Sequence, residues 1–252
     1  MPKRSWRLID SGLVAPAESA ALDEAILEAH IASKVPSTLH FYRRDRPTIS
    51  IGYFQKLVES VDVAECERRG VALVRRKSGG SSIYTDPGQL IYGLVVHEDD
   101  LPRDRSDSFR IVCTAIANAM RVFGVDAVYR PMNDVEVGGM KISGNAQLRR
   151  KGSVLQHGTV VVDTNMKQMD SVLRILKLAP GVGVRPSTRV TTLAALIGST
   201  PDMDLVKGAL VSAFGESFKV RFVSSPLSEV EGSLVRKLVR ERYSRKEWTF
   251  KF

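Results

Sequence analysis

The sequence predicts an α+β fold built around a mainly antiparallel sheet. Segments of strand character and segments of helical periodicity are mixed along the chain, without the strict strand–helix alternation of a parallel α/β fold. Residues 106–123 place apolar side chains on one helical face and are followed by Gly124, a typical stop signal. Residues 89–97 form a nearly continuous apolar run, which is typical of a buried strand.

In the first part of the chain, apolar periodicity and helix- or strand-ending residues predict the elements. Leu22, Ile26 and Ala29 recur at the spacing of one helix face, and Gly70 stands where a helix would end. A charged turn ending in Pro47 separates two strand-like segments. The expected elements are a helix over 19–31, strands over 39–42 and 48–52, a short helix over 61–69, and strands over 71–74 and 89–97.

After the helix over 106–123, glycine pairs and turn residues mark hairpins. We expect turns at Gly138-Gly139 and near Lys151-Gly152. Asn165 is a suitable helix N-cap. The remaining elements are a strand over 154–163, a helix over 165–177, a loop over 179–188, and helices over 202–214 and 227–243 around a strand near 218–223.

Length and composition exclude several classes of protein. The 252 residues fit one large domain or two small ones, with 43% hydrophobic and 26% charged residues. The apolar runs are too short for a membrane span, and no signal peptide is expected, so we expect a cytoplasmic protein that acts on no membrane. The two cysteines, Cys66 and Cys113, are too few for a disulfide framework or a cysteine-rich zinc site.

The charge balance leaves three kinds of partner open. A net charge of +9 suits nucleic acid, an anionic small ligand or an acidic protein, or is simply a solvated basic surface. Aromatic residues make up only 7% of the chain, which disfavours a base-stacking surface. Basic clusters at 43–46, 75–77 and 149–151 stand beside glycines or predicted strand ends, where ligand sites are common.

The segment from Arg75 to Asp86 is the first candidate site. Arg75, Arg76 and Lys77 precede a small-residue loop, Ser78–Ser82, whose backbone can approach a ligand closely. An arginine beside such a loop suits a carboxylate or a phosphate. The spacing is not that of a P-loop, and a plain turn flanked by solvated arginines is the alternative interpretation.

A second candidate combines Asn133 and Asp134 with Lys141. If Gly138-Gly139 turns a hairpin, alternation places Lys141 and Ser143 on one face and Met140 and Ile142 on the other. A fixed lysine would face a phosphate, and Asp134 could hold a magnesium ion. A surface hairpin with an exposed lysine is the alternative.

A third candidate is His157, which is followed by Gly158 and Thr159. A single histidine in a strand is more often a packed, hydrogen-bonded residue than a catalyst. Two interpretations of His157 therefore stay open, a structural role in the strand and a role in the site.

The three candidates, in this order, resemble the lipoate–protein ligase A family within the biotin and lipoate protein ligases. The resemblance runs from about Arg7 to Trp248. The residues that carry it are Arg75–Gly80, Ile83, Tyr84, Asp86, Gly88, Asn133, Asp134, Gly139, Lys141–Gly144, Ala146, His157–Thr159, Arg189–Thr191 and Leu193. The chain departs from the family pattern at Ser81, Ser82, Thr85, Gln89 and Asn145.

The resemblance implies a central mixed sheet like that of biotin ligases and class II synthetases. It implies one catalytic domain over 1–252, without the small C-terminal domain of longer ligases, which is either a separate accessory subunit or dispensable. The implied activity is ATP-dependent conversion of lipoate to lipoyl-AMP, followed by transfer to a lysine of a lipoyl-carrier domain. The net charge of +9 favours an acidic domain as this acceptor. The implied cofactors are ATP and Mg²⁺, and no nucleic acid is expected as a partner.

The same resemblance implies the site residues. Lys141 would contact the lipoate carboxyl group and the α-phosphate, and Asp134 would bind magnesium. Ile49, Ile51 and the strand over 71–74 would wall the acyl slot. The substrate- and nucleotide-binding residues would be Arg76, Ser78, Gly79, Gly80, Ser81, Ser82, Ile83, Tyr84, Asn133, Lys141, Ser143, Gly144, Ala146, His157, Gly158 and Thr159.

Two other functions stay open. A cysteine-dependent octanoyl or lipoyl transferase on the same fold needs a thiolate near a lysine. Cys66 and Cys113 stand on predicted helices, away from the segments at 131–134 and 181–188 where such a cysteine is expected. A non-catalytic basic binding module is the other alternative.

Overall fold

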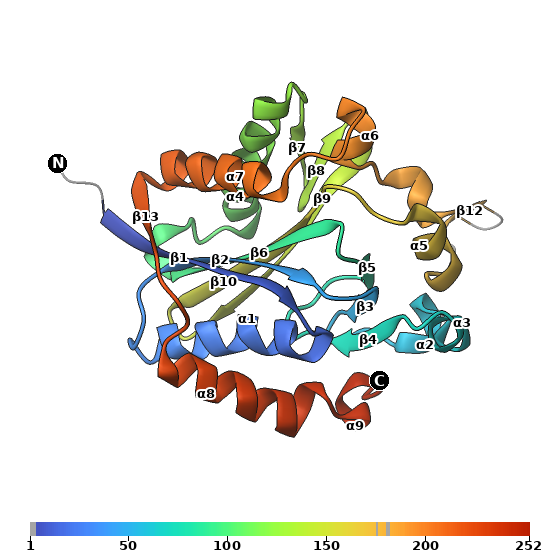
Figure 1. Ribbon diagram of the computed structural model, residues 1–252, viewed down its shortest axis with the longest axis horizontal. Coiled ribbons are helices and arrows are strands. Elements are labelled where there is room, and N and C mark those ends of the chain that lie inside the picture. Colours follow the sequence, from blue (N-terminus) through green and yellow to red (C-terminus); the bar gives the residue numbers. More distant parts are fainter. Residues whose placement is uncertain (1–3, 175, 180–181) are drawn as a thin grey trace.

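The computed structural model describes residues 4–174, 176–179 and 182–252. Within this part of the chain, eight strands form the main sheet (Figure 1). In spatial order they are β13 (Val220–Ser224), β1 (Arg4–Val14), β2 (Thr38–Arg44), β6 (Gln89–His97), β10 (Ser153–Val161), β9 (Met140–Arg150), β8 (Asp134–Val137) and β7 (Val128–Arg130). Strand β1 runs parallel to both of its neighbours, and the other pairs are antiparallel. The predicted mixed, mainly antiparallel sheet is confirmed.

A second, small sheet stands beside the main one and carries the first candidate site. It pairs β4 (Ala72–Arg75), β3 (Thr48–Ile51) and β5 (Ile83–Thr85), in that order. The strands predicted over 39–42 and 48–52 therefore exist, but they lie in different sheets. The loop that joins β4 to β5 contains Ser78–Ser82 and faces the main sheet across a cleft.

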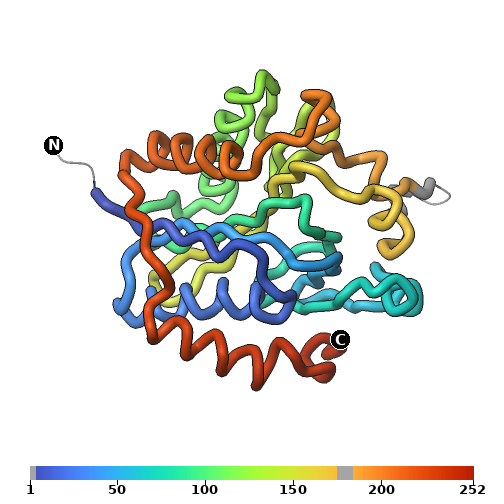
Figure 2. Tube along the Cα trace, in the orientation of Figure 1, coloured from blue at the N-terminus to red at the C-terminus, as the bar shows by residue number. Residues whose placement is uncertain are grey.

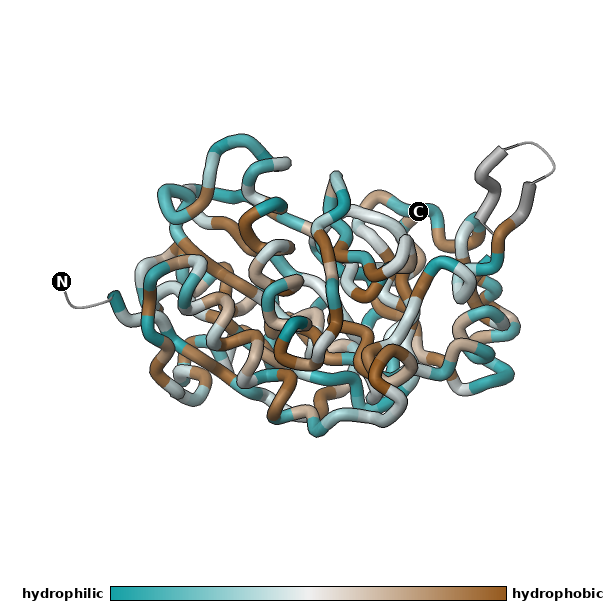
Figure 3. Tube along the Cα trace, turned by 90° about the horizontal axis from the view of Figure 1, so that it is seen from above, coloured by the Kyte–Doolittle hydropathy of each residue, from teal (hydrophilic) through white to brown (hydrophobic). Residues whose placement is uncertain are grey.

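Helices cover both faces of the main sheet (Figure 1). Helix α1 (Pro16–Ile31) and helix α8 (Glu229–Leu238) lie on one face, and α4 (Arg105–Met120) and α7 (Met203–Phe218) lie on the other. Figure 2 shows the C-terminal segment running beside α1. Helices α1 and α8 are in extensive contact. Figure 3 shows the hydrophobic segments mainly in the interior of the molecule. The largest buried cluster lies under α4 and α7 and includes Phe41, Tyr92 and Phe214.

Short elements complete the fold and mostly follow the sequence pattern. Asn165 caps α5 by accepting a hydrogen bond from the Gln168 amide, as predicted, but α5 ends earlier than expected, at Val172. A hairpin of β11 (Leu176–Ala179) and β12 (Val182–Val184) occupies part of the loop predicted over 179–188, whose residues 180 and 181 lie outside the described residues. The other short helices are α2 (Leu57–Ser60), α3 (Val63–Arg68), α6 (Leu193–Ile197) and α9 (Lys246–Thr249), with 3₁₀ turns at Glu98–Asp100, Arg121–Phe123 and Pro186–Arg189 and a π turn at Val239–Tyr243.

Among the residues that the structure describes, no helix combines the length and the apolar character needed to cross a membrane.

Candidate active site

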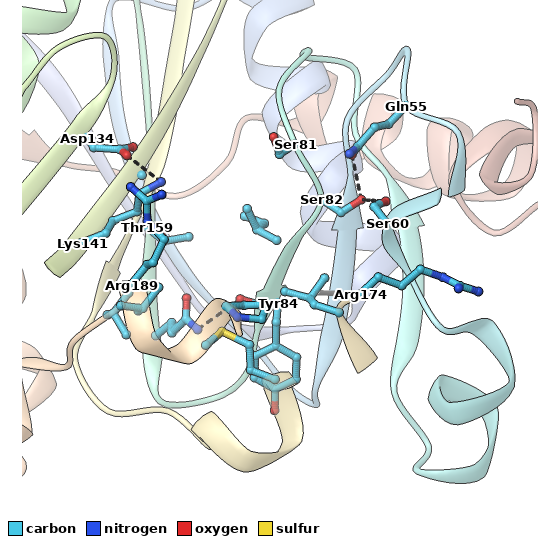
Figure 4. Close-up of a pocket in the computed structure, with 18 of the residues that line it drawn as sticks. Gln55, Ser60, Ser81, Ser82, Tyr84, Asp134, Lys141, Thr159, Arg174 and Arg189 are labelled. Atoms are coloured by element: carbon cyan, nitrogen blue, oxygen red, sulfur yellow. Dashed lines mark hydrogen bonds and ion pairs between the residues drawn. The ribbon is translucent and has the colours of Figure 1, made fainter. Parts of the chain in front are cut away.

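Two adjoining cavities form one cleft between the small sheet and strands β8, β9 and β10. The inner cavity has a volume of about 190 Å³, and the outer one about 1080 Å³. Figure 4 shows Ser81 and Ser82 on one side of the cleft and Asp134, Lys141 and Thr159 on the other. The residues that line both cavities are Ser81, Ile83, Asp134, Lys141, Gly144 and Thr159. The structure thus brings the first two candidate sites together.

The Arg76 guanidinium holds the Ser78–Ser82 loop in shape. The Arg76 residue is only 8% exposed, and the three guanidinium nitrogens all donate to groups of the protein. Nη1 donates to the Ser50 carbonyl at 2.8 Å, and Nη2 donates to the Gly79 and Ser81 carbonyls, each at 2.8 Å. Burial, with a smaller contribution from the nearby Arg44 charge, lowers the pKa of Arg76 to about 10. Arg76 therefore acts mainly as a clamp on the loop.

The clamp directs amide groups of the loop. In a planar trans peptide the N–H points away from the preceding C=O. Because the Gly79 and Ser81 carbonyls point to Arg76, the N–H groups of Gly80 and Ser82 point away from it. Gly80, Ser81 and Ser82 belong to the cleft lining. The loop can therefore present amide donors to a negatively charged oxygen.

Gly52 is required for this packing. A Cβ atom at position 52 would lie 1.8 Å from the Gly80 carbonyl oxygen, a distance that no side chain can occupy. Gly80 itself has φ +94°, in the region that glycine adopts most readily. The two glycines let the β3 end and the loop approach each other at the cleft.

Arg75, unlike Arg76, lies outside the cleft lining. Its side chain is fully buried and donates to the carbonyls of Gly52 (2.8 Å), Gln55 (2.7 Å) and Thr249 (3.1 Å). It joins the small sheet to the C-terminal segment. Of the two neighbouring arginines, Arg75 therefore anchors the C-terminal segment, and Arg76 holds the Ser78–Ser82 loop.

Lys141 supplies a positive charge on the opposite wall. Its Nζ lies 2.7 Å from Asp134 Oδ2, and its side chain is 39% exposed. The aliphatic part crosses Gly144, where a Cβ would lie 3.4 Å from Lys141 Cδ. The Thr191 amide donates to the Lys141 carbonyl at 2.9 Å, which brings the Arg189–Thr191 segment beside β9.

The predicted alternation along β9 is wrong. Between Val135 and Glu136 the pairing of β8 with β9 shifts register, so the strand does not alternate regularly past Lys141. Ile142 joins the main hydrophobic cluster, and Ser143 is buried with its Oγ 3.3 Å from Asn145 Nδ2. Lys141 faces the cleft, whereas Ser143 lies on the core side and does not line either cavity.

Asn133 and Asn145 hold the two strands at the cleft edge. The Asn145 amide donates to the Asn133 carbonyl at 3.1 Å, and the Asn133 side chain donates back to the Asn145 carbonyl. Gly158 packs against this pair, since a Cβ there would lie 2.1 Å from Asn145 Oδ1. Asn133, Ala146, Gly158 and Thr159 all line the inner cavity, and their roles in binding stay predictions.

His157 connects the loop to helix α1. Its Nε2 lies 2.6 Å from Ser78 Oγ, and its Nδ1 lies 2.6 Å from Asp23 Oδ2. Tyr42 also donates to Asp23 Oδ2, at 3.2 Å, and burial raises the pKa of Tyr42 well above its ordinary value. Asp23 and Tyr42 line the inner cavity and were missed in the sequence, and Arg44, from the basic cluster at 43–46, lines it too. Asp23 could have been found in the sequence, because an acidic residue beside the apolar face of the helix predicted over 19–31 is unusual.

Part of the lining of the outer cavity is apolar. Val58, Val161, Met169, Leu173 and Val190 contribute to its lining. The prediction that Ile49, Ile51 and the strand over 71–74 form the wall is wrong, because none of these residues lines either cavity. Ile49 and Ile51 are completely buried in the cluster that contains Tyr84. Tyr84 donates to Gln168 at 2.9 Å. Ser82 donates to Gln55 at 2.7 Å (Figure 4).

The two thiols of the chain lie outside the cleft lining. Cys66 and Cys113 are both buried, and burial raises their pKa values to about 11 and about 12. Cys113 Sγ lies in the main hydrophobic cluster, 3.4 Å from Asn145 Nδ2. Neither sulfur has the low-pKa, accessible environment of a nucleophilic cysteine.

The comparison with protein families decides the affiliation of the chain. Residues 15–215 match the model of the lipoyl protein ligase A/B catalytic domain. The chain belongs to this family. The predicted family is confirmed, and the lipoyl protein ligase A/B fold explains the mixed sheet and the cleft between its two sheets.

Members of the lipoyl protein ligase A/B family with curated names resemble this chain over its whole length. An octanoyltransferase LipM of Geobacillus kaustophilus is 30% identical over 282 residues and covers all of both chains. The octanoyltransferase LipM of Carboxydothermus hydrogenoformans is 32% identical over 268 residues, covering 98% of this chain and 99% of that protein.

Solved structures of the same family share the architecture. A lipoate-protein ligase A bound with ATP is 31% identical, with a TM-score of 0.85 over 99% of both chains. A bi-partite lipoate protein ligase from Thermoplasma acidophilum is 30% identical, with a TM-score of 0.85 over 98% of this chain and 96% of that one. A biotin protein ligase from Aquifex aeolicus, 14% identical with a TM-score of 0.51, shares only the fold, as predicted.

The predicted ATP-dependent ligase activity is wrong, because the curated relatives are octanoyltransferases. For the same reason, three further predictions are wrong. They are ATP and Mg²⁺ as cofactors, lipoate as substrate and lipoyl-AMP as intermediate. The structure shows other uses for the residues that suggested them. The Arg76 donors are occupied by the protein, and the Asp134 carboxylate pairs with Lys141.

Proposed function

We propose that this chain is an octanoyltransferase that moves an octanoyl group from a thioester donor to the ε-amino group of a lysine on a lipoyl domain, without ATP. The names of the curated relatives support the octanoyl group. The observation that carries the proposal is the cleft in which Lys141 and the Ser78–Ser82 loop face each other. A thioester is already activated, so its transfer to an amine needs no adenylate.

The two walls of the cleft suit the oxyanion of acyl transfer. When an amine attacks a thioester carbonyl, negative charge develops on the carbonyl oxygen. The Lys141 ammonium and the amides of Gly80 and Ser82 would stabilise that charge from opposite sides. These groups are held in place beforehand, by the Asp134 pair and by the Arg76 clamp.

The acceptor lysine is the nucleophile in this proposal. Its nitrogen forms the new C–N bond, the C–S bond breaks, and one amine proton goes to the departing sulfur. Nearby positive charge on Lys141 disfavours the protonated form of an incoming lysine, which favours the reactive free amine. Direct attack is consistent with the positions of Cys66 and Cys113, which lie buried outside the cleft lining.

The remaining site residues take roles that follow from their positions. The octanoyl tail would lie against apolar lining residues of the outer cavity, near Val58, Met169 and Leu173. We infer that residues 1–252 act as a single catalytic unit. The residues that we propose to contact or frame the substrates are Arg76, Gly79, Gly80, Ser81, Ser82, Ile83, Tyr84, Asn133, Asp134, Lys141, Gly144, Ala146, His157, Gly158 and Thr159.

The protein partner is proposed to be an acidic lipoyl domain. The net charge of +9 would speed encounter with such a domain. A separate accessory subunit stays a prediction, supported by the bi-partite organisation of the Thermoplasma acidophilum neighbour.

The test is direct. The pure chain is mixed with octanoyl-carrier protein or octanoyl-CoA and an unmodified lipoyl domain, and the mass of the lipoyl domain is followed. We expect octanoylation without ATP and without added metal. Absence of transfer from both thioesters, or transfer that appears only when free octanoate and ATP are supplied, would contradict the proposal.

A further inference from the structure

A buried row of polar groups runs behind the cleft and joins three elements that are far apart in the sequence. Asp23 comes from α1, His157 from β10, and Ser78 from the loop after β4. The three residues are 7%, 8% and 1% exposed, in that order, so the row is almost closed to water. Ser78 does not line either cleft cavity, which separates it from the substrate-facing residues Gly80 and Ser81.

When the His157 ring is neutral, the hydrogen bonds of this row run in one direction. As a carboxylate, Asp23 only accepts, so the 2.6 Å contact with His157 places a proton on Nδ1. In the neutral ring, Nε2 then accepts from the Ser78 hydroxyl, at 2.6 Å. Ser78 Oγ in turn accepts from Arg76 Nε, at 3.1 Å. The order of donation is Arg76 to Ser78 to His157 to Asp23.

The row therefore joins the buried guanidinium of Arg76 to the buried carboxylate of Asp23 through Ser78 and His157. Isolated buried charges are costly, and a continuous row of hydrogen bonds that polarise one another reduces that cost. Besides His157, Tyr42 donates to Asp23 Oδ2, at 3.2 Å. The second carboxylate oxygen of Asp23, Oδ1, has no hydrogen-bond partner among the described residues. This oxygen packs against Gly93, where a Cβ atom would lie 3.1 Å from it.

The far end of the row is the clamp that shapes the loop. Arg76 Nη2 holds the Gly79 and Ser81 carbonyls, and Ser78 fixes the Nε side of the same guanidinium. A shift of Ser78 or of the guanidinium would turn the Gly80 and Ser82 amides away from the reacting oxygen. Because donors to an oxyanion must be preorganised, such a shift lowers turnover more than binding.

We propose that Asp23, His157 and Ser78 form a positioning relay that fixes Arg76 and the Ser78–Ser82 loop for acyl transfer. The proposal rests on the octanoyltransferase function and assigns these residues a role in it. The arrangement resembles a serine–histidine–aspartate triad, but Ser78 Oγ is enclosed and already bonded on two sides. The relay therefore acts through Arg76, and the acyl group is not carried by Ser78.

The test uses Asp23→Asn, Ser78→Ala and the double variant in the octanoyl transfer assay. We expect each single change to lower kcat about tenfold, as for other supporting hydrogen bonds, with KM for the lipoyl domain unchanged. Because the residues act as one unit, the double variant should lose about tenfold, not about a hundredfold. A hundredfold loss, or a loss of less than twofold in the single variants, would overturn the relay.

Ser108→Ala is the matched control. Ser108 is also completely buried and accepts a hydrogen bond from an arginine, Arg149 at 2.5 Å, but it stands at the start of α4, outside the cleft lining. We expect full activity from this variant. Thermal melting of every variant fixes an assay temperature at which all are folded. An octanoyl ester on Ser78, found by mass spectrometry after brief mixing with the donor, would make Ser78 a nucleophile and overturn the positioning role.

Hydrogen exchange separates failure of the relay from failure of the proposed function. In Asp23→Asn we expect faster amide exchange in residues 78–82, although the substitution lies two hydrogen bonds away from the loop. This readout needs no substrate. Unchanged exchange in the loop would overturn the relay even if the wild-type protein transferred no octanoyl group, whereas an inactive wild type would overturn only the octanoyltransferase function.

Discussion

Lys141 carries the charge on which the proposed chemistry depends. Its ammonium faces the Ser78–Ser82 loop across the cleft and is held 2.7 Å from Asp134. Removal of one preorganised donor from an oxyanion site usually costs about a hundredfold to a thousandfold in kcat. We expect Lys141→Ala to lose this much octanoyl transfer while its melting temperature stays close to that of the wild type.

Lys207 offers the matched control for that change. It also pairs with aspartates, Asp10 at 2.6 Å and Asp204 at 2.9 Å, but on α7, away from the residues that line the cleft. Lys207→Ala should keep full activity. Equal losses in the two variants, measured as initial rates at saturating donor, would show that Lys141 has no special role.

The cysteines give a second prediction for single residues. Both thiols are buried and carry raised pKa values, so direct transfer should not need them. We expect the Cys66→Ala, Cys113→Ala double variant to transfer octanoyl groups at the wild-type rate. Cys113→Ala should lower the free energy of unfolding by about 1–3 kcal/mol, because it leaves a space in the main cluster.

Chemical modification checks the same point without mutation. Native protein treated with iodoacetamide should remain active, since accessible thiolate is what this reagent attacks. Loss of transfer in the alkylated protein, matched by loss in the double variant, would establish a cysteine acyl-enzyme and refute direct attack by the acceptor lysine.

At the scale of elements, the contact between the β3 end and the β4–β5 loop shapes the cleft. A Cβ at position 52 would meet the Gly80 carbonyl oxygen at 1.8 Å. Gly52→Ala must therefore push the loop away from its place, and we expect octanoyl transfer to fall more than about tenfold. Gly208→Ala is the control, because Gly208 lies within α7 and a Cβ there meets nothing within 4 Å.

The two substitutions should also differ in stability. Alanine in place of a helical glycine typically stabilises by about 0.5–1 kcal/mol, so Gly208→Ala should unfold at slightly higher urea concentration. Gly52→Ala should unfold at lower urea concentration. If Gly52→Ala were as stable and as active as Gly208→Ala, the close contact in the structure would be wrong.

The elements themselves were largely predictable, and the exceptions have physical causes. The strand over 89–97 and the helix capped by Asn165 follow from local pattern and capping chemistry. The separation of β2 and β3 into different sheets depends on partners far along the chain, which local pattern does not contain. The register shift before Glu136, which places Lys141 and Ser143 on opposite sides, likewise depends on cross-strand pairing.

The site was predictable to a similar extent. Small residues and charges indicated the loop and Lys141, and both line the cleft. Asp23 could not be linked to His157 from the sequence, since 134 positions separate them and only the packing of α1 on the sheet makes them neighbours. Sequence also could not show that the Arg76 donors are used internally.

For the whole molecule, a buried ion pair ties the first strand to the last long helix. Arg7 on β1 donates to Glu231 on α8, with contacts of 2.8 Å and 2.5 Å, and both side chains are nearly inaccessible. Although burial opposes ionisation, hydrogen bonds from Arg7 and Ser228 lower the pKa of Glu231 below its ordinary 4.5. A carboxylate with a lowered pKa stabilises the fold above about pH 4.5, and that stabilisation disappears as the pH falls through the folded-state value.

Glu231→Gln tests this coupling. Breaking a buried pair from one side costs about 3–5 kcal/mol, so the variant should be much less stable than the wild type at pH 7. The difference should shrink as the pH falls below about 4.5. Urea unfolding from pH 7 to pH 3 measures it, and a difference that stays constant across this range would contradict the role of the Glu231 charge.

The parallel pairing of β1 with β13 has a consequence for biosynthesis. Arg4 stands opposite Val220 and Leu8 opposite Ser224, so the N-terminal strand meets one of its two neighbours only after most of the polypeptide has been made. A ribosome-bound nascent polypeptide that stops before residue 220 exposes one edge of β1, and exposed strand edges invite aggregation. Completion of the native sheet should therefore come late in translation.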